Sequence, residues 1–105
     1  MVIAVDFDGC ITENDRILPE AIGVLRLAQE KGHKLILWTC KSERYLGDVV
    51  EAMLDRDLKF DAVNANVPDS EWFSFPKVYA DIYLDDKSFP PFSGWEAFGD
   101  YLEGV

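Results

Sequence analysis

Hydrophobic residues along this chain fall into four short runs separated by longer stretches of mixed character. These runs lack a regular polar alternation, which is typical of strands buried on both faces of a parallel sheet. The first run ends at two acidic residues and a glycine, and the second ends at Thr39. We therefore predict strands over residues 2–5, 35–38, 60–63 and 82–84.

Hydrophobic residues recur at helical spacing between the first two runs. A first helix is predicted from Pro19, because proline is favoured at the first helical position. Its buried stripe would contain Ile22, Leu25 and Ala28. Gly32 follows the last periodic residue and is expected to end the helix.

Two further helices are predicted downstream. The first follows Ser42, which can act as its N-cap. Its hydrophobic stripe consists of Leu46, Val49, Val50, Met53 and Leu54. A last, short helix is expected over residues 95–102, and residues 64–76 are expected to be irregular.

Strands that alternate with helices predict an α/β fold, a three-layer Rossmann-like parallel sheet covered by helices on both sides. With 105 residues, the chain is expected to form a single domain over residues 1–105. If residues 2–5 form a central strand, the second strand lies on one side of it and the fourth on the other, and the polar groups at their ends converge. Ligands of such sheets bind at the carboxyl ends of the strands, where strand order reverses.

The formal net charge of −10 works against binding of DNA or RNA through their phosphate backbones. No apolar run approaches the length of a membrane span, and no basic segment precedes the first run. We therefore expect a soluble, cytoplasmic protein that binds neither membranes nor long nucleic acids.

The cysteine and histidine content excludes some kinds of metal site and argues against a disulfide. Cys10 and Cys40 form neither a CxxC pair nor a zinc-type cluster. We expect two inert, partly buried thiols in a reducing cytosol rather than a regulatory disulfide. The single histidine, His33, excludes a histidine-rich metal site and is expected at the surface.

Acidic pairs follow the first and fourth predicted strands. Asp6 and Asp8 come after the first strand, and Asp85 and Asp86 come after the fourth. Each pair alone could cap a turn. Carboxylates gathered at one sheet edge, however, repel each other and lose hydration unless a cation compensates them. Because Mg²⁺ prefers hard oxygen ligands, the two pairs together predict a Mg²⁺ site.

Thr39 and Lys77 supply the groups that a phosphate would need. A hydroxyl at a strand end before a helix can join backbone N–H groups in holding phosphate oxygens. A lysine ammonium can neutralise the charge that spreads over those oxygens during transfer. Lys41 and Ser42 lie near Thr39 in the sequence and could share this role.

These residues resemble, in order, the four motifs of the haloacid dehalogenase (HAD) superfamily. The matching segments are Asp6-Phe7-Asp8-Gly9-Cys10, Trp38-Thr39, Lys77 and Leu84-Asp85-Asp86. The resemblance spans almost the whole chain and implies a minimal HAD core. The chain departs from the family at Cys10, where threonine or valine is usual, and in its short length after the fourth motif.

The resemblance implies a hydrolase, a Mg²⁺-dependent phosphomonoesterase that works through an aspartyl-phosphate. Asp6 would attack phosphorus and form the covalent intermediate. Asp8 would protonate the leaving alkoxide and then take a proton from the attacking water. A dehalogenase is disfavoured, because that chemistry would need neither Asp8 nor the metal.

The resemblance also implies the metal ligands and the phosphate-binding groups. The cation would bridge Asp6, the backbone carbonyl of Asp8 and the acids of the fourth motif. Asp86 is the preferred direct ligand, with Asp85 in an outer or water-mediated position. The phosphoryl group would be positioned by Thr39 and Lys77.

Substrate choice in this family usually resides in inserted cap domains. An inserted domain that folds alone needs more than about 40 residues, and neither residues 9–38 nor residues 40–76 leave that room. Resemblance to capless members implies a bulky phosphorylated substrate, or a homo-oligomer whose neighbour closes the site. Sugar phosphates, nucleotides and polynucleotide ends all remain candidates.

Residues 64–76 are the expected rim of the site. The side chains that would face a substrate are Asn64, Asn66, Trp72 and Phe73, although the aromatic ones could instead pack on the sheet edge.

Two alternatives to the phosphatase stay open. A receiver domain, which is a signalling module, also carries acids, a hydroxyl residue and a lysine at strand ends. Its phosphorylated aspartate should follow a middle strand, whereas the third run here ends in Val63-Asn64 and Asp61 lies at its other end. The other alternative is a non-catalytic HAD-like domain that only binds phosphate, but no group of the motifs is missing.

Overall fold

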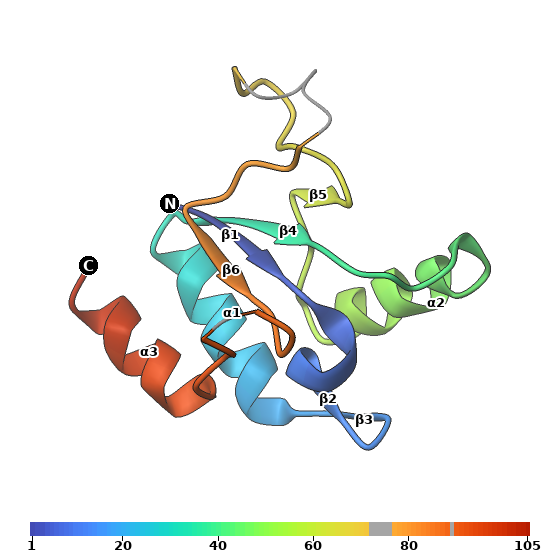
Figure 1. Ribbon diagram of the computed structural model, residues 1–105, viewed down its shortest axis with the longest axis horizontal. Helices are drawn as coiled ribbons and strands as arrows, with labels where there is room; N and C mark the ends of the chain where they lie inside the picture. The colour runs from blue at the N-terminus through green and yellow to red at the C-terminus, as the bar shows by residue number, and fades with distance from the viewer. Residues whose placement is uncertain (72–76, 89) are drawn as a thin grey trace.

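Figure 1 shows a central sheet of parallel strands in the order β5-β4-β1-β6. The computed structural model describes residues 1–71, 77–88 and 90–105. The strands of this sheet are β1 (Val2–Val5), β4 (Lys34–Leu37), β5 (Ala62–Val63) and β6 (Ile82–Leu84). The predicted α/β, Rossmann-like fold class is confirmed, and β1 lies between β4 and β6.

The strand register places the carboxyl ends of β1, β4 and β6 side by side. Val5 lies next to Leu37 of β4 on one side and next to Leu84 of β6 on the other. The third strand is shorter than predicted because Asp61 begins the pairing with β4 through its side chain. Its carboxylate accepts a hydrogen bond of 2.7 Å from the N–H of Leu35.

The three α-helices of the described residues lie close to the predicted ranges. They are α1 (Pro19–Glu30), α2 (Glu43–Leu54) and α3 (Trp95–Glu103). Gly32 follows α1 with a φ of 88°, a left-handed conformation that favours glycine after a helix. Ser42 occupies the N-cap of α2 but makes no side-chain capping bond. Leu54 was expected in the buried stripe and is instead half-exposed, because it lies at the last residue of α2, beside the stripe.

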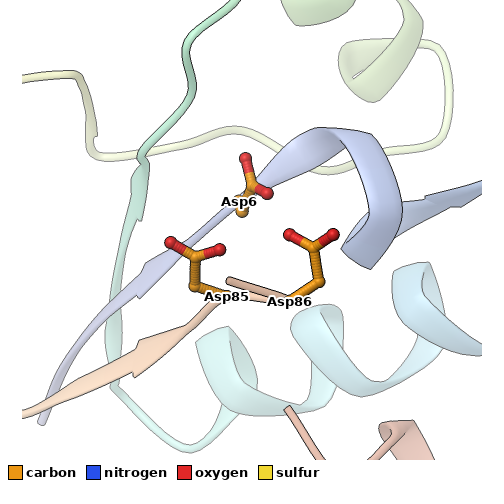
Figure 2. Close-up of side chains that lie close together, drawn as sticks. All are labelled: Asp6, Asp85 and Asp86. Atoms are coloured by element: carbon orange, nitrogen blue, oxygen red, sulfur yellow. The ribbon is translucent and has the colours of Figure 1, made fainter. Parts of the chain in front are cut away.

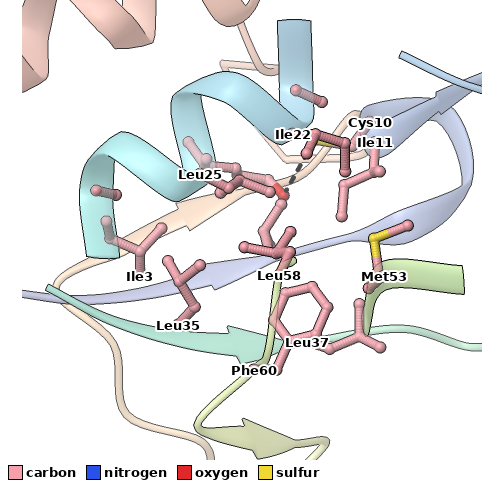
Figure 3. Packing of buried hydrophobic residues seen from close by; sticks show 14 of the residues in the cluster. Ile3, Cys10, Ile11, Ile22, Leu25, Leu35, Leu37, Met53, Leu58 and Phe60 are labelled. Atoms are coloured by element: carbon pink, nitrogen blue, oxygen red, sulfur yellow. Dashed lines mark hydrogen bonds between the residues drawn. The ribbon is translucent and has the colours of Figure 1, made fainter. Parts of the chain in front are cut away.

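The helices pack on one face of the sheet. Because parallel crossovers are right-handed, the two steps from β1 to β4 and on to β5 place α1 and α2 on the same face. The main core cluster accordingly joins Ile3 and Leu35 of the sheet to Leu25 of α1, Met53 of α2 and Leu102 of α3. Several of these residues are seen packing together in Figure 3.

The opposite face has a thinner cover than expected. The return step from β5 to β6 crosses this face, where Val78 and Ala80 pack on Ala4 and Ile36. We expected helices on both sides, but the described parts of this connection, residues 64–71 and 77–81, contain none. Pro68 and the positive φ angles of Asn64 and Asp69 are incompatible with a regular helix there.

A turn and a hairpin that the sequence analysis did not predict lie between β1 and α1. The chain forms a wide, π-type turn over Phe7–Ile11 and then an antiparallel hairpin of β2 (Thr12–Glu13) and β3 (Arg16–Ile17). Asn14 and Asp15 join the two strands with φ angles of 53° and 63°. Two positive φ angles match the twist of a two-residue hairpin turn, and Asn and Asp tolerate them.

The cysteines and the histidine differ in their surroundings. Both cysteines were expected to be partly buried free thiols; both are free, but Cys10 is fully buried and Cys40 is exposed. His33 was expected at the surface but is partly buried, with its Nδ1 atom 2.9 Å from the amino nitrogen of Met1. Burial, and then the adjacent amino group, lower the pKa of His33. Within the described residues, no helix is long and apolar enough to cross a membrane.

Candidate functional site

Asp6 is the first residue after β1 and is held by both neighbouring segments. Its backbone N–H donates a hydrogen bond of 2.9 Å to the carbonyl of Leu84, which continues the pairing of β1 with β6. Its side-chain Oδ1 accepts a hydrogen bond of 2.9 Å from the N–H of Phe7. The carboxylate is therefore oriented by the turn that begins at Phe7.

Asp85 and Asp86 reach the same place from β6. Since Val5 and Leu84 are partners in the sheet, the residues that follow them emerge side by side at the carboxyl edge. One carboxylate oxygen from each of Asp6, Asp85 and Asp86 lies within 4.8 Å of the other two. Figure 2 shows the three carboxylates gathered around a common space.

This arrangement raises the energy of an ionised Asp6. Burial raises the pKa of Asp6 to about 6, the hydrogen bond from Phe7 opposes this change, and the nearby Asp85 and Asp86 add to it. A hard divalent cation would remove the repulsion among the three groups, and carboxylate oxygens are ligands that Mg²⁺ accepts. These three residues could therefore hold a divalent metal ion.

Gly9 allows the turn after Asp6 to pass against Asp86. Its φ is 79°, and a Cβ atom added to it would lie 2.5 Å from Asp86 Oδ2. The backbone conformation therefore favours glycine at this position, and any larger residue would have to push the Asp86 side chain aside.

Asp8 is not one of the three converging carboxylates. Its side chain is half-exposed and forms an ion pair with Lys41, whose Nζ lies 3.2 Å from Oδ1 and 3.3 Å from Oδ2. Asp8 nevertheless lines the same cleft as Asp6, Asp85 and Asp86. Of the four acids predicted for the metal site, three come together through their carboxylates, and Asp8 faces the cleft beside them.

Thr39 lines this cleft from the end of β4. Its backbone N–H donates a hydrogen bond of 2.8 Å to Asn64 Oδ1, and its hydroxyl oxygen accepts one of 3.1 Å from the N–H of Lys41. The cleft has a volume of about 660 Å³. Its lining consists of Asp6, Asp8, Trp38, Thr39, Cys40, Asn64, Asp85, Asp86 and Lys87.

Lys77 does not line the cleft. Its side chain is exposed, no ion pair joins it to another described residue, and its carbonyl accepts a hydrogen bond of 3.1 Å from Asn66. The structure therefore leaves Lys77 apart from the five other predicted site residues.

Of the two described residues predicted for the rim, Asn64 and Asn66, one faces the cleft. Asn64 lines the cleft, whereas Asn66 is buried and also accepts a hydrogen bond of 2.6 Å from the N–H of Tyr79, so it supports the backbone instead. Trp72 and Phe73 lie outside the described residues.

The sequence analysis missed two contacts within the site. Lys41 was named as a residue that could share phosphate binding with Thr39, but its ion pair with Asp8 was not foreseen, and neither was the hydrogen bond from the N–H of Thr39 to Asn64. The only indication in the sequence that Lys41 belongs to the site was its position two residues after Thr39. No local pattern could have indicated a contact between residues as far apart as Thr39 and Asn64.

Comparison with known proteins gives one structural relative. The structure of the conserved protein coded by locus from Bacteroides thetaiotaomicron superposes on this chain with a TM-score of 0.85 and 33% sequence identity. The match covers 99% of this chain and 90% of the other chain. No family model and no curated protein matches the sequence.

Proposed function

We propose that this chain, which belongs to the family of that conserved Bacteroides thetaiotaomicron protein, catalyses Mg²⁺-dependent hydrolysis of a phosphate monoester. The proposal is drawn from the chemistry at the carboxyl edge of its sheet. The observation that carries the proposal is the convergence of Asp6, Asp85 and Asp86 in a cleft that Asp8 and Thr39 also line. Metal-binding carboxylates beside a further carboxylate and a strand-end hydroxyl suit phosphoryl transfer. Membership in the HAD superfamily is part of this proposal.

Asp6 and Asp86 would hold the ion directly, together with the backbone carbonyl of Asp8. Asp85 would hold it from further out, because its Oδ1 already accepts a hydrogen bond of 2.9 Å from the N–H of Lys87. Bound Mg²⁺ supplies positive charge that offsets the carboxylates and the phosphoryl oxygens.

Asp6 would be the nucleophile. One of its oxygens is held by the N–H of Phe7, which orients the carboxylate for attack on phosphorus. The new bond between Asp6 and phosphorus forms as the ester bond breaks, and the leaving alkoxide takes a proton from Asp8. In the second step, Asp8 accepts a proton from water, whose oxygen displaces Asp6 and releases inorganic phosphate.

The substrate would be a phosphorylated molecule that enters an open cleft. Between β1 and β4 the chain forms only a turn, a short hairpin and α1, so no domain is inserted between these two strands to cover the site. An open cleft favours a bulky phosphate ester, or a second copy of the chain that completes the cover. The free thiols Cys10 and Cys40 are compatible with the reducing cytoplasm that we propose as its location.

The proposal is tested by hydrolysis of p-nitrophenyl phosphate with and without Mg²⁺. We expect turnover that requires the metal and falls by at least about 10²-fold in Asp6→Asn and in Asp8→Asn. Asp100→Asn, an exposed position on α3, is the matched control and should retain activity.

Other outcomes would replace this function. Full turnover by Asp6→Asn would exclude the proposed nucleophile. Stoichiometric phosphorylation without release would indicate a receiver-like signalling domain. Absence of turnover over a broad panel of phosphate esters would indicate a domain that only binds phosphate.

A further inference from the structure

We infer that Lys41, rather than Lys77, is the residue that binds the phosphoryl group of the substrate. The inference rests on the proposed function and assigns the phosphate-binding cation within that site. It comes from the ion pair between Lys41 and Asp8 at the cleft and from the position of Lys77 outside it.

The ammonium group of Lys41 lies beside the proposed acid. Its Nζ is 3.2 Å and 3.3 Å from the two oxygens of Asp8, so the ammonium faces both oxygens of that carboxylate. An ammonium has three N–H donors, so at least one is left for a phosphoryl oxygen. Lys41 would thus bridge Asp8 and the substrate and hold Asp8 near the leaving group.

Lys41 is held both at its backbone and at its ammonium group. Its backbone N–H donates to the hydroxyl of Thr39, which in turn is held by Asn64. Its Nζ lies 5.6 Å from the centre of the buried Phe7 ring, a distance at which a cation and an aromatic ring attract each other. The Lys41 side chain is 29% exposed, so the ammonium stays accessible to a ligand while its position is restricted. A cation held in place before the ligand arrives is what phosphate recognition requires.

The negative charge of the cleft makes a cation necessary for binding a phosphate group. Four carboxylates line the cleft, and one divalent ion offsets only half of their charge. A phosphate dianion adds further negative charge. Lys87 also lines the cleft, but within the described chain no ion pair involves its exposed side chain. Among the described lysines, Lys41 is the one whose ammonium is held against a cleft residue.

The test compares four variants: Lys41→Gln, Lys41→Arg, Lys77→Gln and Lys34→Gln. Lys34 is exposed at the opposite, amino end of β4 and serves as the matched control. Binding of inorganic phosphate in the presence of Mg²⁺ would be measured by calorimetry, and binding of Mg²⁺ alone would be measured separately.

We expect Lys41→Gln to raise the Kd for phosphate by about 10- to 100-fold, the usual loss for a hydrogen bond to a charged group. Its Mg²⁺ affinity should stay equal to that of the wild type or increase, because the variant removes a positive charge from an acidic cleft. Lys41→Arg should keep most of the phosphate affinity. Lys77→Gln and Lys34→Gln should remain within about two-fold of the wild type.

A loss of phosphate binding in Lys77→Gln would overturn the inference, and so would unchanged binding in Lys41→Gln. An equal loss of Mg²⁺ and phosphate affinity in Lys41→Gln would show a disturbed cleft and would also count against it. Removing an exposed ion pair costs little stability, so the variant should fold, which circular dichroism would verify. If it does not, Lys41→Arg and Lys77→Gln still decide between the two lysines.

The same measurements separate this inference from the proposed function. A wild-type protein that binds phosphate through Lys41 but hydrolyses no ester would refute the phosphatase and leave the assignment of Lys41 intact. A wild-type protein that binds no phosphate even with Mg²⁺ would refute both.

Discussion

At the scale of single residues, Asp6 shows how the fold creates a group that needs a cation. Its carboxylate is partly buried and close to two others, so ionisation is less favourable than in the unfolded chain. The pKa is raised from 3.8 to about 6 in the folded protein. An acid with a raised pKa stabilises the fold while protonated, and this contribution is lost as the pH rises through that interval.

This linkage predicts a pH-dependent effect of Asp6→Asn. In the absence of metal, the variant should be more stable than the wild type at pH 7, and the difference should vanish below about pH 4. Saturating Mg²⁺ should reverse the order at pH 7, because only the wild type gains the full binding energy. Urea unfolding at several pH values would measure both effects. A stability difference between Asp6→Asn and the wild type that does not depend on pH would contradict the raised pKa of Asp6.

A second prediction at the scale of single residues concerns the substitution of Gly9. Gly9→Ala should lower the free energy of unfolding by at least about 1–2 kcal/mol, the cost of a left-handed conformation in a residue with a Cβ atom. It should also weaken Mg²⁺ binding, because the new Cβ would displace Asp86. Thermal unfolding and metal titration would measure these changes.

Gly23→Ala is the matched control for Gly9→Ala. Gly23 lies within α1, and a Cβ added there meets no atom within 4 Å. Since alanine is the better helix former, this change should raise the stability by about 0.5–1 kcal/mol. Equal effects of the two substitutions would rule out the specific contact of Gly9 with Asp86.

At the scale of secondary-structure elements, Asn64 connects the ends of β4 and β5. Its side chain accepts the N–H of Thr39, and its own N–H donates a hydrogen bond of 2.7 Å to the carbonyl of Leu37. Its φ of 50° belongs to a left-handed conformation that asparagine tolerates. The residue therefore fixes the loop that carries Thr39 and Lys41.

Two substitutions of Asn64 separate its structural and electrostatic contributions. Asn64→Ala should cost about 1–2 kcal/mol of stability, through the lost hydrogen bond and the unfavourable φ. Asn64→Asp keeps the acceptor and should stay near the wild-type stability, while its added negative charge weakens phosphate binding. Chemical denaturation and phosphate titration would test this, and equal destabilisation by both variants would contradict it.

At the scale of the whole molecule, the net charge of −10 and the metal site affect stability together. Mg²⁺ at 100 times its Kd should raise the free energy of unfolding by about 2.7 kcal/mol, because the ion binds the folded state. Asp86→Asn should remove most of this gain. Thermal unfolding in Mg²⁺, and in NaCl of the same ionic strength, would show whether the effect is specific. An equal effect of NaCl would mean that general screening of the acidic surface explains it.

Most of the secondary structure was predictable, because the longer strands and the α-helices each have a hydrophobic pattern that can be recognised in the sequence. The boundaries of β1 and β6 matched the hydrophobic runs, and α1 began at Pro19 as expected. The hairpin at Asn14 and Asp15 was missed, since its strands have only two residues each and no periodicity to detect.

The sequence by itself determined the hydrophobic runs that form the parallel strands, and it placed Asp6, Asp85 and Asp86 at the carboxyl ends of two of them. Both features can be read along the chain, because a hydrophobic run and the residues that follow it form a local pattern. Only the tertiary structure decided that Lys41 pairs with Asp8, that Lys77 lies apart, and that one face of the sheet is covered without a described helix. These depend on contacts between side chains distant in sequence, which packing and charge select only after the chain has folded.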